Sequence, residues 1–156
     1  MGDAELKEGD MAPDFSLPSS TGNNISLKDY RSKRVILYFY PKDDTPGCTK
    51  EACSFRDDSA KYEKQNTVIL GVSGDDLDSH QKFINKYSLP FPLLSDMENK
   101  VSKAYGVYKL KNMYGKEYWG IERTTFLIDE KGRIEKIFPK VKVDGHSEDL
   151  LDLLKK

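Results

Sequence analysis

The sequence predicts an α/β fold in which helices flank a mixed central sheet and a hairpin stands at the N-terminus. Three observations support this fold class. Strand patterns alternate with helix patterns through the middle of the chain, a hairpin pattern and a final helix follow, and two short extended segments precede them all. At 156 residues the chain has the length of one domain, so we expect a single domain over residues 1–156.

The N-terminal hairpin is predicted from two short extended segments that turn residues separate. The segments are Phe15–Leu17 and Ile25–Leu27, and between them lie Pro, Ser, Thr, Gly and Asn residues, which favour turns. The segment Leu27–Tyr30 then fits a single helical turn.

The first long strand is predicted at Val35–Tyr40, an uninterrupted apolar run that suits a strand buried on both faces of a sheet. Pro41 cannot donate a hydrogen bond to a neighbouring strand, so it ends this one. Thr45 followed by Pro46 is a helix start signal, with a hydroxyl at the cap and a proline at the first helical position. We expect this helix to continue to about Gln65.

The remaining elements follow from the same signals. In chain order we expect strand Thr67–Val72, a helix opened by Asp75 and Asp76 that ends near Tyr87, strand Leu93–Leu94, helix Glu98–Tyr105, strand Thr124–Ile128 paired with Arg133–Phe138, and helix Ser147–Lys155. Leu77, Phe83 and Ile84 should lie on the buried side of the second helix. Residues Gly106–Ile121 are rich in Tyr, Gly and Lys, and the pattern leaves open how an extended segment and a loop divide them.

The composition argues against several classes of function. The formal net charge is −1, so no cationic excess points to nucleic acid or to an anionic membrane. The apolar runs are too short to span a bilayer, and the polar N-terminus lacks the apolar core of a signal peptide. Two cysteines do not make the disulfide framework of a secreted protein. We therefore expect a cytoplasmic protein without nucleic-acid or membrane partners.

Cys48 is the candidate reactive residue, because it falls on the third residue of the helix that Thr45 caps. The backbone N–H groups of a first turn have no partner within the helix, and the positive end of the helix dipole points at them. Both favour the thiolate, which is the nucleophilic form of cysteine. Gly47 has no side chain, so a small substrate could approach the backbone there. The alternative is an inert structural cysteine; the capping pair, the glycine and the nearby Cys53 weigh against it.

A cation is expected close to the thiol. An ordinary cysteine has a pKa of about 8.5, and bringing such a thiol to about 6 requires about 3.4 kcal/mol. A helix N-terminus supplies about 0.3–1 kcal/mol, and up to about 2 kcal/mol in partly buried sites. Lys42 and Lys50 are nearby in the sequence, and a distant Arg is another source. Asp43 and Asp44 increase the need if they lie close to the thiol.

Cys53 cannot reach Cys48 while the helix is intact. Five helical residues place the second thiol about 140° around the axis and about 7.5 Å along it, so the two Cα atoms are about 8.7 Å apart. A disulfide needs a Cα separation of about 4.4–6.8 Å. A bond between the two cysteines therefore requires the start of the helix to unwind.

The pattern Pro41-x-x-x-Thr45-x-x-Cys48 resembles the active-site signature of the peroxiredoxins. The longer run through Cys53 and Phe55-Arg56-Asp57 resembles the peroxiredoxin Q branch, also called bacterioferritin comigratory protein. The resemblance extends over nearly the whole chain, from the N-terminal Gly-Asp-Met-Ala-Pro-Asp-Phe segment to the last helix. It implies a thioredoxin-like fold and thiol-dependent reduction of hydrogen peroxide and organic hydroperoxides. No cofactor is needed, because the sulfur atoms carry the electrons.

The resemblance also implies roles for individual residues. Cys48 is the peroxidatic thiol that becomes a sulfenic acid, and Cys53 resolves it as a disulfide within one chain. The hydroxyl of Thr45 bonds the bound peroxide, and Arg123 meets the thiolate as the missing cation. Glu51 is similar to a family glutamate that orients this arginine; an acid that merely suits the first turn of a helix is the alternative interpretation.

The expected partners are a hydroperoxide substrate and a thioredoxin-like protein reductant. Relatives in this branch are often monomers, and no cysteine follows Cys53 to reach another subunit, so we expect a monomer. Two other functions stay open. One is a disulfide exchange enzyme, which would ordinarily carry Cys-x-x-Cys, and the other is a redox sensor that passes its oxidation to a partner.

No metal or cofactor site is expected. Two cysteines and two scattered histidines match zinc-site spacing poorly, and no phosphate loop, haem motif or flavin motif occurs. We interpret His80 and His146 as ordinary surface residues, and the single tryptophan, Trp119, as a residue that packs in the core or in a loop.

Overall fold

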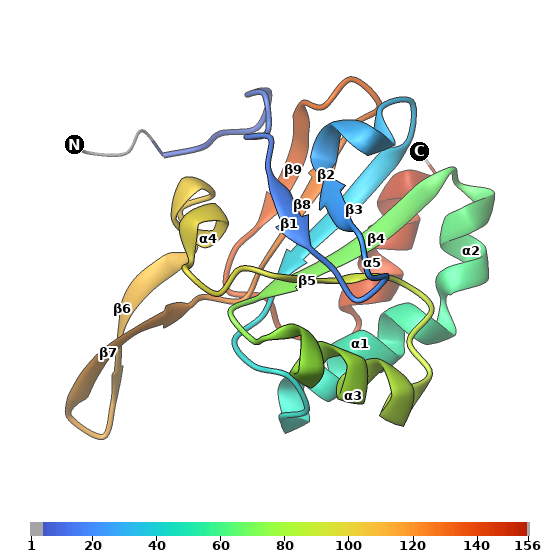
Figure 1. The fold of residues 1–156 in the computed structure, drawn as a ribbon. Helices are drawn as coiled ribbons and strands as arrows, with labels where there is room; N and C mark the ends of the chain where they lie inside the picture. Colours follow the sequence, from blue (N-terminus) through green and yellow to red (C-terminus); the bar gives the residue numbers. More distant parts are fainter. Residues whose placement is uncertain (1–4, 156) are drawn as a thin grey trace.

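A five-stranded sheet forms the centre of the computed structural model, which describes residues 5–155 (Figure 1). The strands lie in the order β5-β4-β3-β8-β9. Their bounds are β3 Arg34–Phe39, β4 Thr67–Ser73, β5 Leu93–Ser95, β8 Thr124–Ile128 and β9 Ile134–Phe138. β3 pairs in parallel with β4 and antiparallel with β8, so the mixed sheet expected from the sequence is confirmed.

Helices and a small hairpin cover the two faces of this sheet. The helices are α1 Pro46–Asp57, α2 Ser59–Lys64, α3 Leu77–Tyr87, α4 Lys100–Ala104 and α5 His146–Leu154. The buried side chains of α1, α2, α3 and α5 form the core on one face. On the other face the core includes α4 and the N-terminal hairpin. No helix within residues 5–155 combines the length and the apolar character of a membrane span.

The N-terminal hairpin and the helical turn after it are confirmed, with each strand shifted by one residue. The hairpin consists of β1 Ser16–Pro18 and β2 Asn24–Ser26, which pair antiparallel. The 3-10 helix η1 Leu27–Tyr30 follows directly.

The packing of β3 explains why its sequence is an uninterrupted apolar run. Successive side chains of a strand point to opposite faces of the sheet. Ile36 and Tyr38 belong to the core on the side of α1, whereas Val35, Leu37 and Phe39 belong to the core under the N-terminal hairpin. β3 is therefore buried on both faces. The loop that follows its C-terminal end leads directly to the start of α1.

The region that the sequence pattern left open forms a second antiparallel hairpin, which projects from the sheet in Figure 1. Its strands are β6 Tyr108–Met113 and β7 Lys116–Ile121. Trp119 lies on β7, is 60% exposed, and stacks on Tyr108 with the ring centroids 5.9 Å apart. Trp119 is therefore not a core residue, although its ring does pack against a neighbour.

The sequence predicted one helix from Pro46 to about Gln65, but the helix is broken. It stops at Asp58, where φ is −98° and ψ is 5°, and α2 begins one residue later. The Asp58 carboxylate accepts a hydrogen bond from Ser147 Oγ of α5 at 2.7 Å. This contact holds the junction of the two helices against α5.

Two expectations about burial on the later helices are wrong. Leu77 opens α3 and is 36% exposed, so it does not line the core, whereas Phe83 does. His80 and His146 are not surface residues. His80 is completely buried, and His146 is 7% exposed with Nε2 2.9 Å from Thr125 Oγ1.

Candidate active site

Cys48 lies in the first turn of α1, as the helix start signal predicted. Thr45 is the N-cap residue with extended backbone angles (φ −99°, ψ 157°), and Pro46 is the first helical residue. The Thr45 carbonyl accepts the first helical hydrogen bond, from the Thr49 N–H at 2.8 Å. Cys48 is only 2% exposed, so the helix dipole acts on a sulfur that has lost most of its water.

The hydroxyl of Thr45 does not cap the helix, contrary to the prediction. It donates a hydrogen bond to the Lys42 carbonyl at 2.9 Å and makes no side-chain cap bond. This contact closes the turn that precedes α1. A hydroxyl oxygen keeps two acceptor lone pairs, so Thr45 can still receive a hydrogen bond while it holds the turn.

Arg123 supplies the cation that was expected near the thiol. It lies in the link between β7 and β8, and its Nη2 is 3.4 Å from Cys48 Sγ. Its Nη1 donates to Glu51 Oε1 at 2.7 Å. The planar guanidinium can make both contacts at once because its N–H groups form a rigid fork. Lys50 is engaged elsewhere, in an ion pair with Asp144.

The Glu51 carboxyl is buried against this arginine, at 2% exposure. Burial raises the pKa of Glu51 to about 7, although the charge and the hydrogen bond of Arg123 act in the opposite direction. Burial lowers the pKa of Arg123, but Glu51 and Cys48 outweigh it and raise that pKa above its ordinary value. Arg123 therefore stays charged, and its contact with Glu51 fixes the direction in which the guanidinium points.

Gly47 makes room for the guanidinium. A Cβ atom on this residue would lie 3.0 Å from Arg123 Nη2, which is closer than ordinary van der Waals contact. A larger residue at this position would push Arg123 away from the Cys48 sulfur. The sequence suggested only that a substrate could approach the backbone here; the close approach in the structure is that of the arginine.

Cys53 lies further along α1 and is half-buried, and both cysteines are free thiols. The helix is continuous over Pro46–Asp57, so the separation of about 8.7 Å between the two Cα atoms applies. This distance excludes a disulfide in the folded helix.

The two aspartates that precede Thr45 are bonded to α3. Asp43 Oδ2 is 2.6 Å from His80 Nδ1, and Asp44 Oδ2 accepts a hydrogen bond from Lys86 Nζ at 2.9 Å. The sequence did not indicate these contacts. Asp43 and His80 are 37 positions apart, and no spacing rule joins a loop aspartate to a helical histidine at that distance.

Comparisons with known proteins show which family the chain is similar to. The model of the AhpC/TSA family matches residues 8–137. The chain is 51% identical over 150 residues to Peroxiredoxin Bcp of Bacillus subtilis, and the match covers 96% of each protein. It is similar to the crystal structure of Xylella fastidiosa PrxQ, with a TM-score of 0.92, 39% identity and 97% of each chain covered. It is also similar to the Xanthomonas campestris bacterioferritin comigratory protein, whose structures address alkyl peroxide reduction, with a TM-score of 0.86, 41% identity and 90% of each chain covered.

Proposed function

Because the chain belongs to the AhpC/TSA family and, within it, to the peroxiredoxin Q branch, we propose that Cys48 is the peroxidatic thiol of this thiol-dependent peroxidase. The thioredoxin-like fold and the reduction of hydroperoxides follow from membership of the family. One observation supports the choice of Cys48 above all. Its buried sulfur lies at a helix N-terminus, 3.4 Å from the guanidinium of Arg123.

The first step transfers one oxygen atom to sulfur. The Cys48 thiolate attacks the terminal oxygen of the hydroperoxide, so that an S–O bond forms as the O–O bond breaks. The alkoxide, or hydroxide when the substrate is hydrogen peroxide, leaves and takes a proton, and Cys48 becomes a sulfenic acid. Arg123 and the first-turn N–H groups stabilise the negative charge on the oxygens, and the Thr45 hydroxyl orients the peroxide.

The second step uses Cys53 as the resolving thiol. Its sulfur attacks the sulfenic sulfur of Cys48, a disulfide forms within the chain, and one water molecule leaves. A dithiol protein of the thioredoxin type then reduces the disulfide by thiol exchange. The whole cycle converts one hydroperoxide and one dithiol into an alcohol, water and a disulfide, without a cofactor.

The resolving step requires α1 to unwind, because the two cysteines are too far apart in the intact helix. We expect the amides of residues 46–56 to lose at least about tenfold of their hydrogen-exchange protection in the disulfide form. Exchange measured by mass spectrometry on reduced and peroxide-treated protein checks this, with α3 and α5 as internal references. Equal protection of residues 46–56 in both forms would contradict the unwinding step.

A peroxide consumption assay tests the proposed function against the two alternatives. We expect catalytic loss of hydrogen peroxide only when a reductant is present, first dithiothreitol and then thioredoxin with its reductase. A disulfide exchange enzyme would consume no peroxide. A sensor would consume one equivalent and then stop, even with thioredoxin present. No peroxide consumption, or consumption that stops after one equivalent, would contradict the proposal of a thioredoxin-linked peroxidase.

Three further expectations complete the proposal: a single domain, a monomer and a cytoplasmic location. A cytoplasmic location suits the proposed cycle, because the reductant must return both cysteines to free thiols after each turnover. The monomer suits a resolving cysteine on the same helix as the peroxidatic one, because no second subunit has to supply a thiol. Light scattering of the reduced and the oxidised protein measures the assembly state directly.

A further inference from the structure

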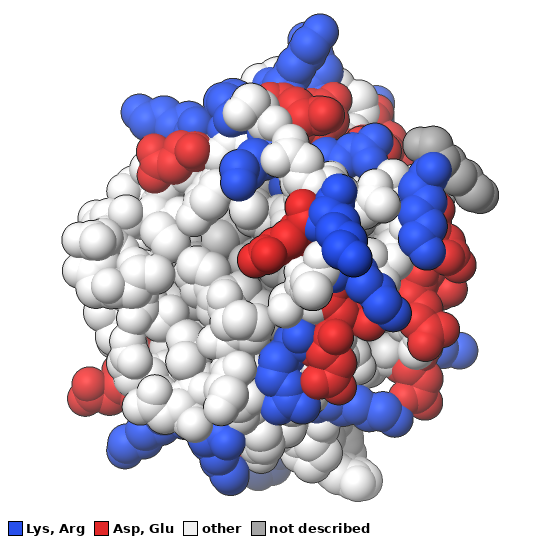
Figure 2. Space-filling model, turned by 90° about the vertical axis from the view of Figure 1, so that its right-hand side faces the viewer, with Lys and Arg blue, Asp and Glu red and all other residues white. Residues whose placement is uncertain are grey.

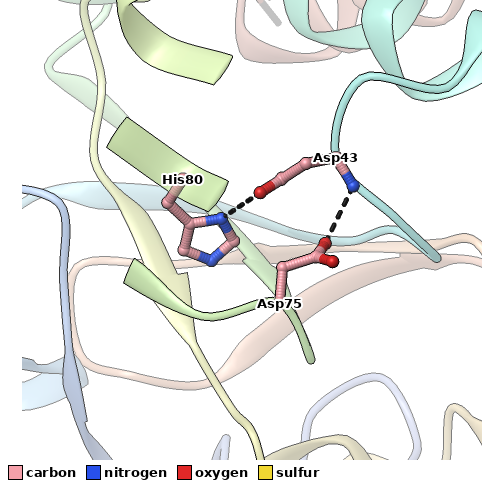
Figure 3. A group of neighbouring side chains, drawn as sticks. All are labelled: Asp43, Asp75 and His80. Atoms are coloured by element: carbon pink, nitrogen blue, oxygen red, sulfur yellow. Dashed lines mark hydrogen bonds and ion pairs between the residues drawn. The ribbon is translucent and has the colours of Figure 1, made fainter. Parts of the chain in front are cut away.

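A buried group of polar side chains lies behind the loop that joins β3 to α1 (Figure 3). His80 of α3 is completely buried, and Asp43 of the loop is 7% exposed. His80 Nδ1 lies 2.6 Å from Asp43 Oδ2, and the backbone N–H of Asp43 donates to Asp75 Oδ2 at 2.8 Å. His80 therefore bonds the side chain of Asp43, and Asp75 bonds its main chain.

The geometry around His80 suits a positively charged ring. Its second ring nitrogen, Nε2, lies 2.9 Å from the carbonyl oxygen of Leu94, so both nitrogens face an acceptor. An imidazolium donates to both acceptors, whereas a neutral imidazole has one N–H and can donate to only one of them.

The surroundings of His80 agree with a charged ring. Burial lowers its pKa, but the hydrogen bond and charge of Asp43, the carbonyl of Leu94 and the charge of Asp75 together raise that pKa above its ordinary value. The phenol of Tyr40, the residue that follows β3, also faces the ring, with the ring centroids 6.5 Å apart. It donates to Asp43 Oδ1 at 2.6 Å.

Both carboxylate oxygens of Asp43 and one of Asp75 already accept hydrogen bonds, so the cluster does not call for a metal ion. Asp43 Oδ2 accepts from Ser79 Oγ at 2.8 Å besides facing the imidazolium, and Asp43 Oδ1 accepts from Tyr40. Asp75 Oδ2 accepts from the Asp43 N–H and from Ser73 Oγ at 2.7 Å. The group therefore acts as a hydrogen-bonded anchor for the loop.

The loop needs such an anchor, because the next residue has a strained backbone. Asp44 has a φ of +56°, in the left-handed region that a residue with a side chain occupies at a cost. Its carboxylate accepts hydrogen bonds from Lys86 Nζ and from Tyr87 OH, both at 2.9 Å. α3 thus holds two successive loop residues, and the residue after them is Thr45.

We propose that His80 is a positioning residue for the peroxidase reaction, whose imidazolium locks Asp43 and thereby fixes the loop that places Thr45 and the first turn of α1 around the substrate. The proposal rests on the proposed role of Cys48. When His80 loses its proton, only one ring nitrogen can still donate and the positive charge beside Asp43 is lost, so the loop is held less tightly. Because the pKa of His80 is raised, the anchor is complete below about pH 6.5, the ordinary histidine value, and is lost as the pH rises through the raised value.

Two substitutions and one matched control test this role. The readout is the second-order rate constant for oxidation of Cys48 by hydrogen peroxide, measured by stopped flow in a single turnover between pH 6 and pH 10. For His80→Leu we expect a rate constant about tenfold lower at pH 7 and no further decline at alkaline pH. His80→Asn should recover part of the rate, because its amide can still donate to Asp43, and it should also lack the alkaline decline.

The control is His146→Leu, which removes the other buried histidine and leaves the loop anchor intact. Burial lowers the pKa of His146 to about 4, so this residue is neutral throughout the measured range. We expect His146→Leu to keep the alkaline decline of the unmodified protein, whatever it does to the melting temperature. If His80→Leu keeps the rate constant and its pH profile, or if His146→Leu loses both to the same extent, His80 has no positioning role.

A second readout separates this proposal from the identity of the peroxidatic thiol. Amide exchange at residues 43–48 of the reduced protein, at pH 7 and without peroxide, should be at least about tenfold faster in His80→Leu, with intermediate values in His80→Asn. This result depends on the anchor and not on peroxide chemistry. If Cys48→Ser still reduces peroxide, the proposed function fails while the exchange result still decides whether His80 holds the loop. Unchanged exchange in both His80 variants overturns the anchor itself.

Discussion

Replacing Cys48 with Ser is expected to lower peroxide reduction by about a thousandfold or more, as loss of a catalytic nucleophile does in other enzymes. A serine hydroxyl is almost entirely un-ionised near neutral pH, so it cannot attack the peroxide oxygen as a thiolate does. Cys53 cannot replace it from its position further along α1, because Arg123 contacts the first-turn sulfur. The measurement is the loss of hydrogen peroxide with dithiothreitol as reductant.

Cys53→Ser is the matched control, since it removes the same atom from the same helix. We expect it to leave the first oxidation of Cys48 intact in a single turnover but to block turnover with thioredoxin. Mass spectrometry should then find the oxygen on Cys48 and no disulfide. Full peroxide consumption by Cys48→Ser would falsify the assignment of the peroxidatic residue, whatever the result for Cys53→Ser.

Arg123→Ala is expected to slow the oxidation of Cys48 by about a hundredfold, the size of effect seen when one donor to a developing oxyanion is removed. Single-turnover kinetics with hydrogen peroxide measure this effect. Arg123→Lys should recover only part of the loss, since an ammonium lacks the planar fork that reaches both Cys48 and Glu51.

The buried Glu51 adds a consequence to this substitution. Its pKa is about 7 even with Arg123 beside it, so without the cation the carboxyl takes up a proton at neutral pH instead of remaining as an uncompensated charge. Arg123→Ala should therefore fold. Arg133→Ala is the control. This exposed arginine donates to the Gly9 carbonyl, and it lies beyond the opposite end of β8 from Arg123. Equal kinetics in the two alanine variants would place Arg123 outside the reaction.

Much of the fold could be predicted because its signals are local. The apolar run at Val35–Tyr40 and the Thr45-Pro46 pair each report on a few neighbouring residues, and the structure has a strand and a helix start there. The need for a distant cation could also be derived, from the gap between what a helix end supplies and what an ionised thiol needs. Its identity as Arg123 came from family resemblance, because no local pattern links positions 75 residues apart.

The expectations that failed depend on contacts between distant segments. His80 looked like a surface residue because histidine is polar, yet the acceptors that satisfy it in the interior come from a loop and a strand. Trp119 was expected in the core or in a loop because of its size, yet it lies on a strand of a hairpin that leaves the sheet, where it stacks on Tyr108. The end of α1 at Asp58 is held by Ser147, a contact with a helix formed by the last part of the chain. Helical periodicity continues across the break and gives no sign of it.

That break has a consequence for the cooperativity of opening. If one continuous helix ran from Pro46 to Lys64, unwinding its first turns would also disturb the packed residues at its C-terminal end. Otherwise the boundary between the unwound and the helical part would be strained. Here α1 has 12 residues and α2 has 6, and α2 keeps its own attachment to α5 through Asp58 and through the hydroxyl of Tyr62, which lies 2.8 Å from Ser147 Oγ. We therefore expect the segment that carries both cysteines to open locally, at a free energy set by its own contacts and below the global stability of the protein. Substitutions elsewhere in the core could raise the melting temperature and leave the speed of disulfide formation unchanged.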